Sequence, residues 1–195
     1  MNSPRNVSIL VFDDVEVLDF CGPYEVFNVA SAAASPPPFY VYSTGITGAA
    51  IQARGRFTFT PRYCINTSPQ ADILVIPGGL GIRPLLKHEQ LISWIADQQR
   101  KVEWLISVST GALLLAKAGL LKNCNATTHH SAFDHLKALS STTTLINDAR
   151  FVQSSPRIFT SGGISAGIDL ALHVVGMLAG PKVHEDVIEE MEYRR

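Results

Sequence analysis

The fold is decided by Trp104-Leu-Ile-Ser-Val-Ser109-Thr110-Gly111-Ala112-Leu-Leu-Leu115, where an apolar run typical of a β-strand turns within a few residues into a helical run. A side chain at such a junction lies on a tight turn, and the backbone N–H groups that follow it point outward at a helix N-terminus. Ser109 is therefore a candidate for chemistry. Because serine and threonine are favoured N-cap residues, the alternative is that Ser109 and Thr110 only cap the helix.

The same alternation of strand and helix patterns runs along the rest of the chain. Buried strands are predicted over residues 7–12, 39–43, 72–76 and 157–160, and a short hairpin or edge strand over 57–60. Helices are predicted over 23–34, with proline at the first turn, and over 84–100, 132–139, 165–178 and 184–195. We therefore expect an α/β fold, with a mostly parallel sheet covered by helices on both faces and a single domain over 1–195.

Composition and charge point to an ordinary globular protein. The 16 Lys+Arg against 17 Asp+Glu give a net charge of -1, which leaves no basic surplus for nucleic acid. The apolar run near the N-terminus is too short for a signal peptide or a membrane span, so we expect a cytoplasmic protein without membrane partners. Cys21 is expected to be a small buried filler. Adjacent His129 and His130 should point apart, and no metal site or disulfide framework is expected.

The ends of the predicted strands carry the polar and glycine-rich segments. In open α/β sheets, ligands bind beyond the carboxyl ends of the strands. Gly78-Gly79 follows one such strand and lets a backbone N–H approach a ligand with no side chain between them. Together with the N–H of Thr110, it could form an oxyanion hole. The alternative is an ordinary glycine turn.

Several motifs, in this order, resemble the ThiJ/PfpI superfamily over nearly the whole chain. They are Phe12-Asp-Asp-Val-Glu-Val-Leu-Asp19-Phe-Cys-Gly22-Pro23, Asp72-Ile-Leu-Val-Ile-Pro77-Gly78-Gly79, Ser107-Val-Ser109-Thr110-Gly111-Ala112, Ala126-Thr-Thr-His129 and Thr160-Ser-Gly162-Gly163-Ile-Ser-Ala-Gly167-Ile-Asp169. The resemblance implies a flavodoxin-like three-layer sandwich related to class I glutamine amidotransferases, and it is greatest to the isonitrile hydratase branch. The same module also forms the ligand-sensing half of AraC-type regulators. No helix-turn-helix pattern follows Arg195, which favours a stand-alone protein.

One position departs from the family pattern. The family's turn reads Cys-Thr-Gly, with cysteine as the nucleophile, whereas this chain has Ser109-Thr110-Gly111. A thiol is partly ionised near neutral pH, but a serine hydroxyl needs a positioned base before it can attack. Either the serine is a natural variant that has lost or changed the chemistry, or it is an engineered replacement of cysteine. The otherwise intact motif favours the replacement.

The resemblance also implies roles for other residues. Asp19 matches the family's acidic partner of the cysteine, a protonated carboxyl that donates a hydrogen bond to the thiolate and later passes a proton to the substrate. Such an acid cannot activate serine. Thr110 and Gly79 would orient substrate and water. His129 matches a histidine near the pocket of several relatives, and it would serve as a base only if its ring reached Ser109.

A hydrolase triad is the competing interpretation of the serine. Ser109, Asp169 and His184 stand in the order of an α/β-hydrolase, but Ser107 occupies the position of the first glycine of the Gly-x-Ser-x-Gly turn. We therefore expect Asp169 to lie inside a helix and to stabilise local structure.

Two functions follow from the resemblance. The first is an isonitrile hydratase-like lyase without a cofactor, which adds water to an isonitrile to give an N-substituted formamide through a nucleophile at position 109. Its serine form would be inactive or weakly active. The second is a non-catalytic module that binds or senses a small molecule. Relatives usually form dimers, and the small residues over 23–34 permit close packing, so we expect a homodimer with the pocket near its interface.

Overall fold

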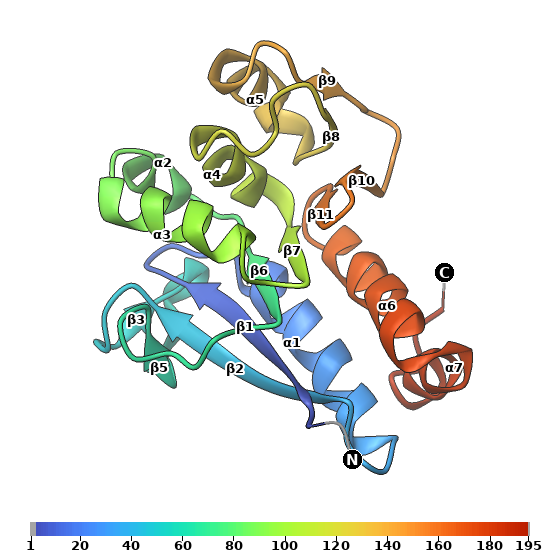
Figure 1. The fold of residues 1–195 in the computed structure, drawn as a ribbon. Coiled ribbons are helices and arrows are strands. Elements are labelled where there is room, and N and C mark those ends of the chain that lie inside the picture. The colour runs from blue at the N-terminus through green and yellow to red at the C-terminus, as the bar shows by residue number, and fades with distance from the viewer. Residues whose placement is uncertain (1–2, 195) are drawn as a thin grey trace.

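The computed structural model describes residues 3–194, which form a seven-stranded sheet with helices on both faces (Figure 1). The strands lie in the order β10-β11-β7-β6-β1-β2-β5, and only the β10–β11 pair is antiparallel. Their bounds are β1 Arg5–Val11, β2 Phe39–Gly45, β5 Tyr63–Cys64, β6 Ile73–Ile76, β7 Trp104–Ser107, β10 Phe151–Ser155 and β11 Ile158–Ser161. This mostly parallel sheet confirms the predicted α/β class.

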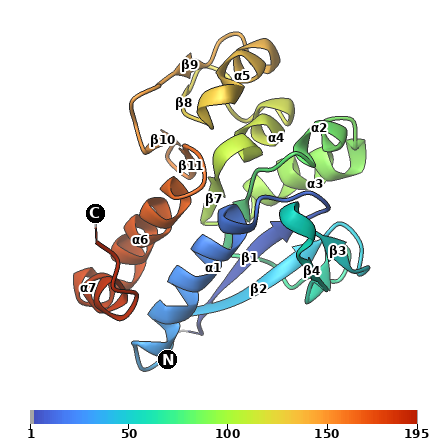
Figure 2. The same ribbon diagram turned by 180° about the vertical axis from the view of Figure 1, so that it is seen from behind.

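The helices form two layers around the sheet (Figures 1 and 2). On one face lie α1 Val17–Ala32 and α6 Ala166–Ala179, with α7 Pro181–Glu190 packed against them. On the other lie α2 Ile82–Leu85, α3 Glu89–Gln99 and α4 Ala112–Lys117. Beyond the sheet, α5 Phe133–Leu139 stands beside two short strands, β8 Asn125–Ala126 and β9 Thr144–Leu145. The predicted hairpin is a two-stranded sheet of β3 Ile51–Gln52 and β4 Thr58–Phe59.

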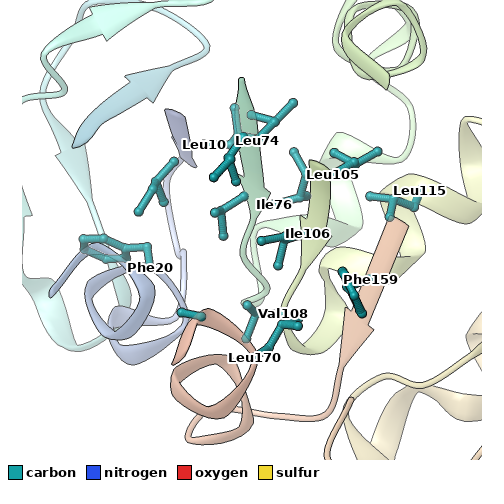
Figure 3. Packing of buried hydrophobic residues seen from close by; sticks show 14 of the residues in the cluster. Leu10, Phe20, Leu74, Ile76, Leu105, Ile106, Val108, Leu115, Phe159 and Leu170 are labelled. Atoms are coloured by element: carbon teal, nitrogen blue, oxygen red, sulfur yellow. The ribbon is translucent and has the colours of Figure 1, made fainter. Parts of the chain in front are cut away.

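Apolar side chains on both faces of the central strands form the core. All four residues of β6 are buried, and so are all residues of β7 after Trp104. Figure 3 shows side chains of β6 and β7 at the centre of this cluster, with Val108 beside Leu170 of α6. Each fully buried aliphatic side chain contributes roughly 1.5–3 kcal/mol, so the ends of these strands are firmly held.

Two glycines bring the helices of one face close to the strand ends. A Cβ at Gly22 of α1 would lie 2.9 Å from Ile168 Cγ1, so α1 and α6 pack tightly at this point. A Cβ at Gly167 would lie 2.8 Å from Val108 Cγ1, just before the predicted turn. These contacts place the start of α1 and the start of α6 beside the carboxyl end of β7.

Several predicted boundaries are wrong. The first helix begins at Val17, so Pro23 lies inside it, because burial of the inward face outweighs the loss of one helical hydrogen bond. The helix predicted over 84–100 is two helices, since the ring of His88 accepts a hydrogen bond from the N–H of Leu91 and starts a new one. Strand β10 was not predicted. The last helix is shifted toward the N-terminus relative to 184–195, and Arg195 lies outside the described residues.

No helix within residues 3–194 combines the length and the apolar character that a membrane crossing requires.

Candidate active site

Ser109 lies on a strained turn directly after β7. Its φ of +55° is in the left-handed region, which is uncommon for residues other than glycine and is typical of functional sites. Its N–H donates to the carbonyl of Gly162 over 3.1 Å, and the hydroxyl of Thr128 donates to its carbonyl over 2.8 Å. No side chain caps the Ser109–Gly111 turn or α4 in the described part of the chain. The structure therefore favours presentation of this side chain over helix capping.

Asp19 lies in the first turn of α1 and is completely buried. Its Oδ2 accepts a hydrogen bond from the N–H of Gly78 over 3.0 Å, whereas its Oδ1 has no hydrogen-bond partner among residues 3–194. Burial raises the pKa of Asp19 to about 7, and the nearby carboxylate of Glu16 raises it further, while the Gly78 N–H and the Ser109 hydroxyl lower it. The carboxyl can therefore hold or release a proton near neutral pH.

The glycine pair supports the two neighbouring side chains. The N–H of Gly78 is bonded to Asp19, and the N–H of Gly79 donates to Thr110 Oγ1 over 3.0 Å. A Cβ at Gly78 would lie 2.6 Å from Thr110 Oγ1 and 2.8 Å from Asp19 Oδ2, so no side chain fits there. The segment is thus more than an ordinary turn. Both glycine N–H groups have acceptors within the protein in this structure, so the oxyanion hole that this pair could form with the Thr110 N–H stays a prediction.

His129 forms part of the site wall and does not contact Ser109 as a base. Its Nδ1 lies 2.8 Å from Ser131 Oγ, and the hydrogen bonds of the described residues include none between His129 and Ser109. Burial and the neighbouring ring of His130 lower the pKa of His129, which keeps the imidazole neutral near pH 7. The two rings were expected to point apart, but their centroids lie 4.1 Å apart with the ring planes tilted by 36°, because both residues stand on the turn that begins the 3-10 helix His130–Ala132.

A cavity of about 390 Å³ opens beside Ser109 and Thr110. This volume is in the range that binds small organic molecules. One wall comes from α2 and the turn before it, the other from the 3-10 helix before α5 and from α5 itself, and the lining is largely apolar. The lining residues are Glu16, Arg54, Gly79, Leu80, Ile82, Arg83, Leu86, Ser109, Thr110, Leu113, His129, Ser131, Ala132, His135, Ala138, Leu139 and Ile164.

Several of these lining residues were not predicted from the sequence. Glu16 forms an ion pair with Arg54, and Arg83 and His135 stand on the two opposite walls. Glu16 lies within a quoted motif but had no role assigned to it, and the other three lie in segments without a recognisable chemical pattern, so only the fold brings the four together. Thr128 was within a quoted motif, but its hydrogen bond to the Ser109 carbonyl could not be seen from spacing.

The structure does not support the hydrolase triad. Asp169 lies in the first turn of α6, where its Oδ2 accepts from Arg150 Nε over 2.7 Å and its Oδ1 accepts from the Tyr193 hydroxyl over 3.1 Å. Neither Asp169 nor His184 is among the described residues that line the cavity. Asp169 has the structural role we expected. Cys21, predicted to be a buried filler, is only half-buried, because it lies on the part of α1 that is not covered by the sheet.

The groups around Ser109 determine which reactions the site could support. No cluster of three or more metal-binding side chains occurs between residues 3 and 194. What the site offers is a nucleophile position on a strained turn, a buried carboxyl that exchanges a proton near neutral pH, and an apolar cavity. These groups suit the addition of a proton and a nucleophile to a small, weakly polar electrophile.

Comparison with known proteins identifies relatives of two kinds. The model of the DJ-1/PfpI family matches residues 5–177. Isonitrile hydratase from Pseudomonas putida is 33% identical over 187 residues, which are 96% of this chain and 78% of that protein. The HTH-type transcriptional regulator GbdR from Pseudomonas aeruginosa is 22% identical over 193 residues, and the chain spans 52% of its length. The crystal structure of a THiJ/PfpI family protein from Pseudomonas syringae superposes with a TM-score of 0.88 at 25% identity, covering 99% of this chain and 76% of that one.

Proposed function

The chain belongs to the DJ-1/PfpI family, and we propose that its cavity binds small isonitriles for the addition of water, giving N-substituted formamides. The observation that carries this proposal is the pairing of the strained turn at Ser109 with the fully buried Asp19. The similarity to the Pseudomonas putida isonitrile hydratase supports the choice of substrate. The apolar lining suits the weakly polar isonitrile group and its hydrocarbon substituent.

The proposed reaction needs a cysteine thiolate at position 109. Asp19 would give its proton to the terminal carbon of the isonitrile while the sulfur forms a bond to the same carbon, which yields a covalent thioimidate. Water would then add to that carbon, the carbon–sulfur bond would break, and the N-substituted formamide would leave as Asp19 regains a proton. The covalent intermediate divides one difficult step into two, so no cofactor is required.

In the present chain the serine hydroxyl stands in the place of that thiol. A hydroxyl does not ionise near neutral pH, and Asp19, which must hold its proton to give it to the substrate, cannot at the same time remove the proton of the serine. His129, the other candidate base, is bonded to Ser131. We therefore propose that the Ser109 protein binds isonitriles but converts them very slowly.

The test is to measure formamide production by the Ser109→Cys variant. The hydroxyl and thiol are similar in size, so the turn should be retained, and turnover should rise by about a thousandfold or more. Mass spectrometry should show the protein mass increased by one isonitrile. Ser131→Cys is the matched control, because it places a thiol in the same cavity away from the strained turn. Equal turnover by the two variants, or fast turnover by the Ser109 protein, would contradict the proposal.

A ligand-binding module without catalysis is the second candidate. It is favoured by the serine at position 109 and by the similarity to a transcriptional regulator. Under this alternative, isonitriles or other small molecules raise the melting temperature of the protein, and Ser109→Cys neither reacts with isonitriles nor has an unusually acidic thiol. Cysteine in the source gene would favour the enzyme, and serine would favour the binding module.

We also propose that the protein acts as a homodimer in the cytoplasm, with its cavity close to the subunit interface. On α1, Leu18 and Tyr24 are exposed large side chains that a partner subunit would cover. Light scattering at micromolar concentration should give the mass of a dimer. A measured mass equal to that of a monomer would contradict the proposed homodimer.

A further inference from the structure

The residues that line the cavity carry more positive than negative charge. Two arginines and one carboxylate line it, and the carboxylate of Glu16 is already paired with Arg54 at 2.5 Å. The guanidinium of Arg83 makes no ion pair and no side-chain hydrogen bond with any residue from 3 to 194. His129 does not add to the charge near neutral pH, because its pKa is lowered. One fixed positive charge is therefore left for a ligand.

Arg83 is the cation of the lining that has no ion-pair partner among the described residues, and it is exposed to solvent on α2, whereas Ser109 is 5% exposed. Much of the rest of the lining is apolar, with Ile82, Leu86 and Leu113 among its side chains. The exposed His135 of α5 is a second polar group of the lining. A ligand that fills this space has an apolar middle, a reacting end at Ser109 and an end that meets Arg83.

We propose that the ligand carries a carboxylate at the end that meets Arg83. The substrate is then a molecule with an isonitrile group at one end and a carboxylate at the other. The proposal rests on the function given above and narrows its substrate class. The planar guanidinium of arginine matches a carboxylate with two parallel hydrogen bonds, and such charge-assisted bonds are about twice as strong as neutral ones. The carboxylate of Glu16 repels such a ligand only weakly, because the ion pair with Arg54 offsets its charge. A cationic ligand would be repelled by Arg83.

The test uses calorimetric binding to the Ser109 protein, which requires no turnover. The probes are isocyanohexanoate, its methyl ester and isocyanohexylamine, which share one hydrocarbon chain. We expect the carboxylate to bind about tenfold or more tightly than the ester, and the amine to bind most weakly. Arg83→Gln should remove the preference for the carboxylate and leave the affinity for the ester unchanged. Arg100→Gln, an exposed arginine at the end of α3 outside the cavity lining, is the matched control and should change neither.

A second series without the isonitrile group separates this inference from the proposed function. Hexanoate and methyl hexanoate test Arg83 alone, and a preference for hexanoate that Arg83→Gln removes would support the carboxylate site even if the isonitrile group adds no affinity. A preference that persists in Arg83→Gln, or an amine that binds as tightly as the carboxylate, would overturn the inference. Thermal unfolding of both arginine variants should match that of the parent protein, since both side chains are exposed.

Discussion

Two buried aspartates at the starts of two packed helices have opposite surroundings. Asp169 in α6 is 4% exposed and is bonded to the guanidinium of Arg150 and to the hydroxyl of Tyr193. Asp19 in α1 is 0% exposed, pairs with no cation of residues 3–194, and leaves Oδ1 without a hydrogen-bond partner. Because α1 and α6 pack directly against each other in the same layer of the fold, the different surroundings of the two aspartates come from their neighbouring side chains.

The difference separates a carboxylate that stays charged from a carboxyl that can change its charge near neutral pH. Burying a charge is costly unless a cation and hydrogen bonds compensate for the lost water, and Asp169 has both. Burial without a cation raises the pKa of Asp19 to about 7, and the repulsion of Glu16 adds to the rise, because the Gly78 N–H and the Ser109 hydroxyl offset only part of the cost of burial. A group that is neither firmly charged nor firmly neutral at physiological pH is suited to passing a proton to a substrate.

The largest expected effect is on turnover. In the Ser109→Cys background, Asp19→Asn removes the proton donor but keeps an oxygen that can accept from Gly78, so turnover should fall about 10²–10⁴-fold. Asp169→Asn is the control, because it changes the carboxylate that does not face the cavity, and it should leave the turnover of folded protein within a few-fold. Formamide production by both variants, corrected for the folded fraction, measures the difference. Equal losses would show that Asp19 is structural as well.

The pH dependence of stability gives the next largest effect. The folded pKa of Asp19, about 7, lies above the unfolded value of 3.8, so between these pH values the folded state holds a proton that the unfolded state has lost. This contribution to the free energy of unfolding is present at acid pH and is lost as pH rises toward 7, by up to about 4 kcal/mol.

Substitution of the two aspartates should therefore change stability with opposite signs at mildly alkaline pH. Asp19→Asn removes the buried charge and should stabilise the protein near pH 8, with little effect near pH 4. Asp169→Asn loses the ion pair with Arg150 and should destabilise it by about 1–3 kcal/mol near pH 8. Urea unfolding at both pH values measures these changes. Destabilisation by both variants near pH 8 would contradict a raised pKa for Asp19.

The smallest expected effect comes from Glu16. Its carboxylate raises the pKa of Asp19, so Glu16→Gln should lower that pKa and move the alkaline limb of the turnover profile of Ser109→Cys to lower pH. The maximal rate should change little, because Glu16 lies at the cavity wall. Glu25→Gln, on the exposed face of α1, is the matched control and should leave the profile unchanged. An unchanged profile, or a shift toward higher pH, would contradict this electrostatic effect of Glu16.

The layers of the fold and the elements of the site motif were predictable, because they depend on local patterns. Apolar runs identified the central strands, and the abrupt change at Ser109 located the turn. Asp19 was identified by resemblance. Its lack of a cationic partner, and of a hydrogen bond to Oδ1 from the described residues, depends on contacts between α1 and the segment at Gly78, which no local pattern contains. The hydrogen bond from the Gly79 N–H to Thr110 Oγ1 could not be predicted for the same reason, because it joins two segments that are far apart in the sequence.

The remaining differences follow from tertiary packing. Pro23 suggested a helix start, but the buried side chains of α1 extend the helix back to Val17. Nothing in the sequence distinguishes Arg83 and His135 from other polar residues, and they line one cavity only because the fold brings α2 and α5 together. Side chains that meet across long sequence separations could not be placed from local patterns.

The positive φ of Ser109 has a consequence for how this protein can evolve. The strain is held by two hydrogen bonds of the Ser109 backbone, since its N–H donates to the Gly162 carbonyl and its carbonyl accepts from the Thr128 hydroxyl, so the turn does not depend on which atom, oxygen or sulfur, ends the side chain. Codons for serine and cysteine differ by a single base. If the proposed function holds, one mutation exchanges a reacting site for a merely receptive one while the scaffold stays intact.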